Sequence, residues 1–181
     1  MKNKMFLLLL TVVFLFPKDD LFHFKFDKLS VNIFSDKLQY IPGDTGVIAV
    51  QIKLNKGCYT YAYTKEKNMD KPATIEITNN DALSNAVIFK QIIYEAGKKK
   101  YDEIEKSYSY IYDDTAVFYI PFEIKKSANL GKYKIYFILN YIICVKEKCM
   151  FNENNFNFDI DVGKKSADSN NRDIFIKYYK K

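Results

Sequence analysis

Residues 135–158 read IYFILNYIICVKEKCMFNENNFNF, and this stretch decides the fold. Two runs rich in strand-forming residues, 135–144 and 149–158, flank the short polar segment Val145-Lys146-Glu147-Lys148. This layout is typical of two antiparallel strands joined by a turn. Cys144 ends the first run and Cys149 begins the second. Directly opposed residues of such a hairpin have Cα atoms about 4.5–5.5 Å apart, which is within reach of a disulfide.

The rest of the chain repeats the strand pattern in shorter pieces. Residues 46–54 alternate in a way that predicts one buried face, and residues 58–63 place Tyr59, Tyr61 and Tyr63 on one face and Cys58, Thr60 and Ala62 on the other. Further strands are predicted at 21–26, 30–34, 73–78, 87–94, 108–112 and 116–124, the last two as a hairpin around Asp113-Asp114. Segments 79–85 and 97–106 are predicted to be loops, and no helical period of useful length is present. Roughly nine short strands predict an all-β, immunoglobulin-like two-sheet sandwich.

Composition is consistent with one folded domain. The chain has 181 residues, 48% of them apolar, with 15 Tyr and 15 Phe. The net charge is +6, but the lysines are scattered among acidic residues. Nucleic-acid binding needs a concentrated basic surface, so this distribution argues against it.

Both ends differ from the predicted sandwich at 21–162. Residues 1–18 have a basic start and an apolar run at 5–16, interrupted at Thr11, which predicts a signal peptide or an uncleaved anchor. The run is shorter than the roughly 20 residues of an ordinary membrane span. No small-x-small triplet follows Phe16, so cleavage stays open, and we predict export. Residues 163–181 form a polar and basic tail, predicted to be largely flexible, in which Ile174-Phe175-Ile176 is a stray strand or a docked segment.

The three cysteines are the candidate reactive groups. In an exported protein this count predicts one disulfide and one free thiol. A disulfide between Cys144 and Cys149 would close a ring of only about six residues, worth roughly 2 kcal/mol as a staple. At a solvent-facing turn the same bond could exchange with other thiols, and Lys146 and Lys148 would favour the thiolate. The spacing alone leaves both roles open.

Other chemistry has less support in the sequence. A zinc site would need Cys58, Cys144, Cys149 and the single histidine, His23, to converge, which the sequence does not show. Cys58 by itself is typical of a small buried apolar residue. The sequence has no phosphate-binding loop and no Ser/His/Asp arrangement, so we predict no metal and no organic cofactor.

Three segments occur in the order and spacing of a known family. They are KGCYTY at 56–61, KYDEIE at 100–105 and NYIICVKEKC at 140–149. Together they resemble the N-terminal periplasmic domain of the thiol:disulfide interchange protein DsbD, over residues 21–162. The resemblance implies an immunoglobulin-like sandwich in which Cys144 and Cys149 are the exchanging pair. It also implies an active-site pocket lined by Tyr59 and Tyr61, and a cap loop containing Asp102, Glu103 and Ile104, with Ile104 where the family often has an aromatic residue.

The resemblance further implies a role in electron transfer. Such a domain takes electrons from a membrane electron-transfer protein, here expected on a separate chain, and passes them to thioredoxin-like periplasmic proteins or to cytochrome c maturation partners. Two departures leave the enzymatic role open: Met150-Phe151-Asn152 stands where the family commonly has prolines, and Cys58 where an aromatic or histidine is usual. The alternative is a non-enzymatic exported binding module of the same fold, with a structural disulfide.

Overall fold

The computed structural model describes residues 22–64, 71–78, 80–102, 106–146 and 148–180. The predicted leader at 1–18 lies outside these ranges and stays a prediction. Within them, neither helix has the length and apolar character needed to cross a membrane.

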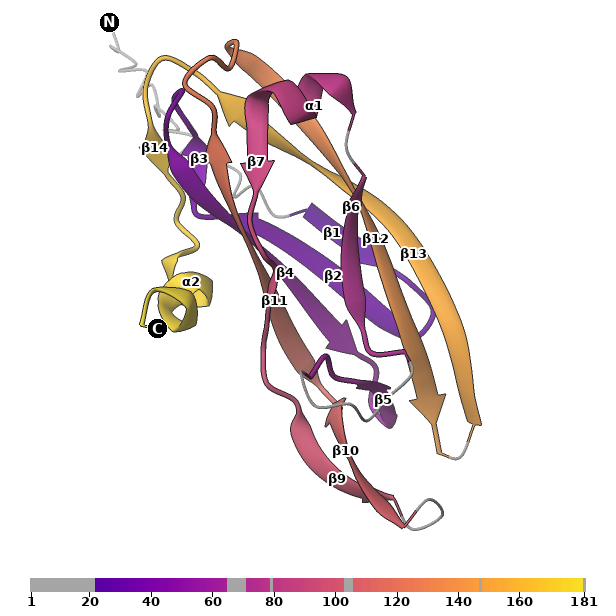
Figure 1. Cartoon of the computed structure of the whole chain (residues 1–181). Helices are drawn as coiled ribbons and strands as arrows, with labels where there is room; N and C mark the ends of the chain where they lie inside the picture. Colours follow the sequence, from indigo (N-terminus) through magenta and orange to yellow (C-terminus); the bar gives the residue numbers. More distant parts are fainter. Residues whose placement is uncertain (1–21, 65–70, 79, 103–105, 147, 181) are drawn as a thin grey trace, which may run out of the picture.

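Two antiparallel sheets pack face to face (Figure 1). The strands of the first sheet lie in the order β1 (Phe22–Lys25), β2 (Leu29–Ser35), β4 (Thr45–Leu54), β11 (Thr115–Ile124) and β7 (Val87–Phe89), with β8 (Ile93–Tyr94) also pairing with β11. The strands of the second lie in the order β13 (Lys148–Val162), β12 (Gly131–Val145), β5 (Cys58–Tyr61), β10 (Ser107–Tyr112) and β9 (Lys98–Asp102), with β6 (Thr74–Thr78) also pairing with β12. Strands β3 (Lys37–Gln39) and β14 (Ala167–Asp168) form a small third sheet. The predicted two-sheet sandwich is confirmed.

The core lies between the two large sheets and follows from strand alternation. Every second residue is buried in β2, as in Leu29, Val31 and Ile33, and in β12 from Ile135 to Ile143. At one edge the sheets meet through aromatic rings: the Phe22 ring centroid lies 5.0 Å from that of Phe158. Burial of such rings is the main stabilising contribution in a sandwich of this kind.

The hairpin of β12 and β13 is confirmed and is longer than predicted. Its register runs without a break from Gly131 opposite Val162 to Val145 opposite Lys148. Lys146, in the turn, has a φ of 55°, in the left-handed region that a tight hairpin turn requires.

Two predictions about the middle of the chain are wrong. The segment predicted as a turn at 97–106 contains strand β9, which pairs with β10 from Lys98 opposite Ile111 to Asp102 opposite Ser107. The predicted hairpin of 108–112 with 116–124 does not form, because β10 lies in the second sheet and β11 in the first. The chain crosses from the second sheet to the first at Asp113 and Asp114. Alternation within a strand predicts which face is buried but not which strand it pairs with.

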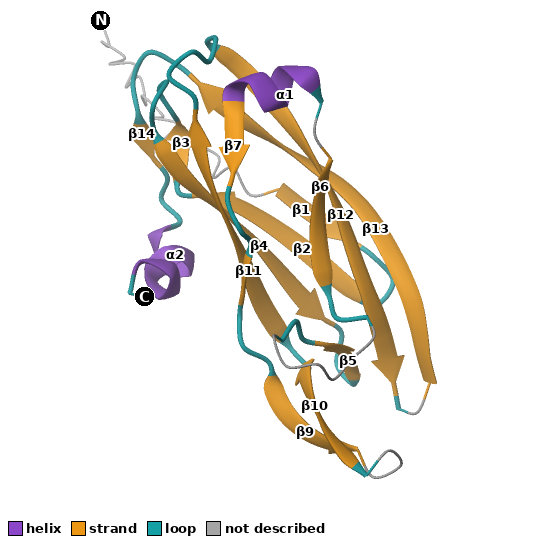
Figure 2. Cartoon of the chain, in the orientation of Figure 1, coloured by secondary structure: helices purple, strands orange, loops and turns teal. Residues whose placement is uncertain are grey.

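Two short helices were not predicted (Figure 2). Helix α1 (Asp81–Ala86) lies in the predicted loop at 79–85, and the Asn80 side chain accepts a hydrogen bond from the Leu83 N–H at 2.9 Å. Helix α2 (Arg172–Tyr179) belongs to the tail predicted to be flexible, and that prediction is wrong. Phe175 is only 1% exposed because it packs on the outer face of β4 and β11. Helix α2 therefore also explains why both faces of β4 are buried, whereas one buried face was expected.

Candidate functional site

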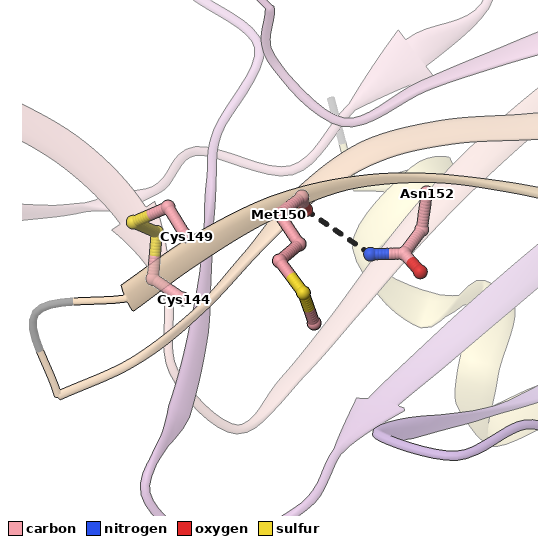
Figure 3. Close-up of a disulfide and its surroundings, with 4 residues drawn as sticks. All are labelled: Cys144, Cys149, Met150 and Asn152. Atoms are coloured by element: carbon pink, nitrogen blue, oxygen red, sulfur yellow. Dashed lines mark hydrogen bonds between the residues drawn. A yellow bond between two sulfur atoms is a disulfide. The ribbon is translucent and has the colours of Figure 1, made fainter.

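Cys144 and Cys149 form a disulfide beside the turn of the β12–β13 hairpin (Figure 3). The two residues are direct partners in the ladder, and their Cα atoms are 4.0 Å apart. Their exposure differs sharply: Cys144 is 0% exposed, whereas Cys149 is exposed. An attacking thiolate must reach a sulfur in line with the bond, so Cys144 is shielded from attack and Cys149 is the exposed residue of the pair.

Tyr59 is the neighbour of Cys144 on its other side. The register of β12 with β5 places Cys144 opposite Tyr59, so Tyr59 and both sulfurs share the outer face of the sheet. Tyr61 follows on the same face, and its ring centroid lies 6.0 Å from that of Tyr59 in an edge-on arrangement. The structure thus brings both predicted tyrosines to the disulfide side of β5.

Cys58 has the opposite orientation. It is the register partner of Val145, one residue beyond the disulfide, and its free thiol is buried among core residues. The sheet backbone therefore separates the Cys58 side chain from the outer face, in keeping with its interpretation as a small apolar residue.

The β9–β10 hairpin places lysines beside this site. The Lys100 Nζ atom lies 3.8 Å from the centroid of the Tyr59 ring, and the Lys99 Nζ atom lies 4.4 Å from that of the Tyr108 ring. Both contacts have the geometry of cation–π interactions. A surface hollow between β5 and this hairpin is lined by Cys58, Tyr59, Lys98, Lys99 and Lys100, among others. In the sequence, Lys98, Lys99 and Lys100 form a cluster of charges that predicts a solvated surface and gives no sign of these ring contacts.

Of the predicted cap loop, only Asp102 is among the residues that the structure describes. Asp102 is the last residue of β9 and is paired with Ser107 of β10. Glu103 and Ile104 lie outside the described residues, so their place relative to the sulfurs stays a prediction.

The β12–β13 and β9–β10 hairpins lie at the same end of the molecule (Figure 1), and both carry exposed apolar side chains. In the β12–β13 hairpin Met150 is 60% exposed and Phe151 is 53% exposed, and Val145 is also exposed. Tyr101 and Tyr108 are exposed on the β9–β10 hairpin. Alternation could have found Phe151, because it lies two residues from Cys149 and therefore on the same face. Clusters of exposed apolar side chains mark contact surfaces for other proteins.

The sheet beneath the disulfide is held by its own polar contacts. The Tyr141 hydroxyl donates a 2.7 Å hydrogen bond to the Asn154 side-chain oxygen, which joins β12 to β13. Burial of this hydroxyl, with a contribution from the charge of Asp27, raises the pKa of Tyr141 to about 12. Figure 3 shows a further contact, in which the Asn152 amide donates to the Met150 carbonyl oxygen at 3.1 Å.

The geometry gives no support to a zinc site. His23 lies on β1, in the other sheet, with its Nδ1 atom 2.6 Å from the Asn32 side-chain oxygen. Two of the three cysteines are bonded to each other, and the third faces inward. Among the residues that the structure describes, no three His, Cys, Asp or Glu side chains are arranged to hold a metal ion.

Comparison with known families now bears on this disulfide. The profile of the family described as "Thiol:disulfide interchange protein DsbD, N-terminal" matches residues 31–159. The chain belongs to this family. Membership in the DsbD N-terminal family confirms the resemblance carried by the tyrosine, cap-loop and cysteine segments. The comparison with curated protein sequences gives no match.

One solved structure shows the same fold, and two others are more distantly similar. The N-terminal periplasmic domain of ScsB from Proteus mirabilis is similar with a TM-score of 0.55 and 15% identity, over 87% of this chain and 56% of that one. The chain therefore spans little more than half of the ScsB structure. The reduced DsbD N-terminal domain of Neisseria meningitidis has a TM-score of 0.41 and 18% identity, over 77% of this chain and 89% of that one. The complex of that domain with the PilB N-terminal domain, from the same organism, has a TM-score of 0.39 and 17% identity, over 76% of this chain and 88% of that one.

Proposed function

We propose that this chain is a periplasmic thiol:disulfide interchange module and that Cys144 and Cys149 are its redox pair. The observation that carries the proposal is the disulfide itself: Cys149 is exposed, Cys144 is buried, and exposed apolar side chains lie at the same end of the molecule. Membership in the DsbD N-terminal family supports the same chemistry.

A purely structural role explains the bond poorly. The two cysteines are already neighbours in a continuous ladder that extends from Gly131 to Val145. A ring of about six residues removes little entropy from the unfolded chain, and it stabilises the fold by only roughly 2 kcal/mol. Disulfides that staple sandwiches of this kind join the two sheets, whereas this one joins adjacent strands of one sheet.

The exchange proceeds through a mixed disulfide. A thiolate of a donor dithiol attacks the exposed Cys149 sulfur, the Cys144–Cys149 bond breaks, and Cys144 leaves with the electron pair and takes up a proton. The second thiolate of the donor then attacks the donor sulfur that is bonded to Cys149. Cys149 is released as a thiolate, which takes up the second proton. The donor becomes a disulfide, and this chain gains two electrons and two protons. The same steps in reverse reduce the disulfide of a client.

The partners follow from the family and from the surface. We propose a membrane electron-transfer protein on a separate chain as the donor and thioredoxin-fold proteins, including those of cytochrome c maturation, as clients. Val145, Met150 and Phe151 give such a protein an apolar surface to contact next to the sulfurs. We also propose residues 1–18 as the export signal, with 5–16 as a membrane anchor where they are retained, and Asp102, Glu103 and Ile104 as the cap over the pair.

Reduction potential tests this function. The protein is equilibrated with glutathione buffers of graded ratio, the thiols are alkylated, and the masses are read. A carrier is expected to have a potential above about −300 mV, within reach of thioredoxin-fold partners. A potential well below that value would instead support a binding module with a structural disulfide.

A further inference from the structure

We propose that Lys100 is a positioning residue that holds the Tyr59 ring beside Cys144, so that Cys144 stays shielded and Cys149 is the sulfur open to attack. The role of this arrangement in thiol–disulfide exchange rests on the function proposed above, whereas the shielding of Cys144 is a property of this chain alone.

The burial of Cys144 needs an explanation because of the face on which it lies. Alternation along β12 places Cys144 on the outer face with Tyr136, which is 47% exposed, and yet Cys144 is 0% exposed. Among the described residues, its direct neighbours across the ladder are Cys149 on one side and Tyr59 on the other. Cys149 lies on the edge strand and is itself exposed, whereas Tyr59 is the large side chain directly opposite Cys144 on the neighbouring strand β5.

Lys100 is placed to fix that ring. It lies on β9 opposite Ser109 of β10, and its ammonium group sits 3.8 Å from the Tyr59 ring centroid on β5. The side chain therefore spans β10 and joins the β9–β10 hairpin to the neighbour of the buried sulfur. A cation over the face of an aromatic ring is attracted by the negative charge density there, which opposes rotation of the ring away from Cys144.

The close approach of β9 depends on Gly97. A Cβ atom at position 97 would lie 2.4 Å from the Ala62 Cβ atom and 3.1 Å from the Ile111 backbone nitrogen. A side chain at this position would push the start of β9 away from β5 and β10. Gly97 thus permits the short path by which Lys100 reaches Tyr59.

Lys99 provides a matched control within the same strand. It adjoins Lys100, is equally a lysine over a tyrosine ring, and contacts Tyr108 at 4.4 Å. Because neighbouring residues of a strand face opposite sides, Lys99 and Tyr108 lie on the face away from the disulfide. Lys99→Met therefore removes the same charge and the same type of contact without touching Tyr59.

The test measures which sulfur reacts. The protein is fully reduced with excess small dithiol, exchanged into buffer, and labelled briefly with iodoacetamide. Tryptic cleavage at Lys146 and Lys148 puts Cys144 and Cys149 on separate peptides, so mass spectrometry gives the labelling ratio directly. The buried Cys58 is an internal standard, because its labelling rises only when the sandwich opens.

In the wild type we expect Cys149 to be labelled at least tenfold faster than Cys144. Lys100→Met and Tyr59→Ala are expected to lower this ratio threefold or more with no change at Cys58, whereas Lys100→Arg and Lys99→Met keep it. An unchanged ratio in Lys100→Met, an equal loss in Lys99→Met, or a parallel rise at Cys58 would overturn the proposal. Labelling needs no partner, so a very low reduction potential would defeat the proposed function and leave this result intact.

Discussion

Cys144 and Cys149 are bonded across a single rung of the β12–β13 ladder, and yet the first is fully buried and the second is exposed. The difference follows from strand order. β12 lies inside the second sheet, with β5 on its other side, whereas β13 is the outermost strand. Cys149 is thus exposed at the open edge of the sheet, and in the proposed exchange Cys144 is the sulfur that leaves.

This asymmetry predicts how the two single variants behave as traps. In Cys144→Ser the exposed Cys149 can attack the disulfide of a thioredoxin-fold partner, but no second thiol on this chain releases the product. We expect this variant to accumulate a mixed disulfide at least fivefold more than Cys149→Ser, measured by non-reducing gels and mass spectrometry. Cys58→Ser, which removes the inward-facing thiol, should behave like the wild type. Equal trapping by both single variants would contradict the order of attack.

Opening the disulfide should cost little stability. The cysteines lie next to the turn of a hairpin that is already paired along its whole length, and the ring that the bond closes is short. We expect reduction to lower the free energy of unfolding by about 2 kcal/mol or less. Urea unfolding of oxidised protein and of protein kept in dithiothreitol measures the difference. A loss above about 4 kcal/mol would identify the bond as a staple.

Phe175 is expected to hold helix α2 on the sandwich. Its ring packs with Val47, Ala49, Val117 and Tyr119, and the Tyr119 hydroxyl donates to the Ile174 carbonyl oxygen at 2.9 Å. Phe175→Ala should cost about 3 kcal/mol, because it leaves a cavity in this second cluster. Faster hydrogen exchange at residues 172–180 would show the helix detaching. Ile176→Ala, at a position that is 42% exposed, is the control and should change little.

Phe175→Ala also tests whether the stability of the tail is independent of the chemistry of the disulfide. Helix α2 lies on the outer face of β4 and β11, apart from the end of the molecule that carries the cysteine hairpin (Figure 1). We therefore expect Phe175→Ala to leave the reduction potential of the disulfide unchanged. A shifted potential would show that the tail and the site are coupled.

Strand alternation predicted the parts of the fold that bury one face. β2 was found because apolar residues recur at every second position there, and the cysteine hairpin because two runs of strand-forming residues flank a short polar segment. β9 was missed because its sequence, KKKYD, has no apolar alternation: the strand lies at the edge of its sheet, where the side chains are solvated. Sheet membership was mispredicted for β10 and β11, since pairing depends on the whole sandwich and not on local sequence.

The missed helices left weaker signals. Asn80 followed by Asp81 is a typical helix start. In the tail, Phe175, Tyr178 and Tyr179 recur at helical spacing, but over only two turns. The cysteine pair was visible from its spacing, whereas the contact of Lys100 with Tyr59 was not, because it joins β9 to β5 across an intervening strand.

Asp44 is expected to make the stability of the fold depend on pH in the acid range. Its carboxylate accepts hydrogen bonds from the Lys37 ammonium at 2.8 Å, the Ile41 N–H at 3.2 Å and the Ser166 hydroxyl at 3.1 Å, so it joins β3 to the segment before β14. Burial alone would raise its pKa, but these hydrogen bonds and the charge of Lys37 together lower the pKa below its usual value of 3.8. A carboxyl whose pKa is lower in the folded state than in the unfolded state stabilises the fold above the unfolded pKa. That contribution is lost as the pH falls through the folded pKa.

We therefore expect Asp44→Asn to lower the free energy of unfolding at pH 7 by roughly 1–3 kcal/mol, the range for a hydrogen bond to a charged group. The loss should shrink as the pH falls below about 4, because the wild-type carboxyl then becomes protonated as well. Urea unfolding at a series of pH values from 7 to 2.5 measures both effects. Asp27→Asn removes a carboxylate that is 83% exposed and should change stability far less at every pH. If Asp44→Asn kept the full acid dependence of the wild type, another carboxyl would be responsible for it.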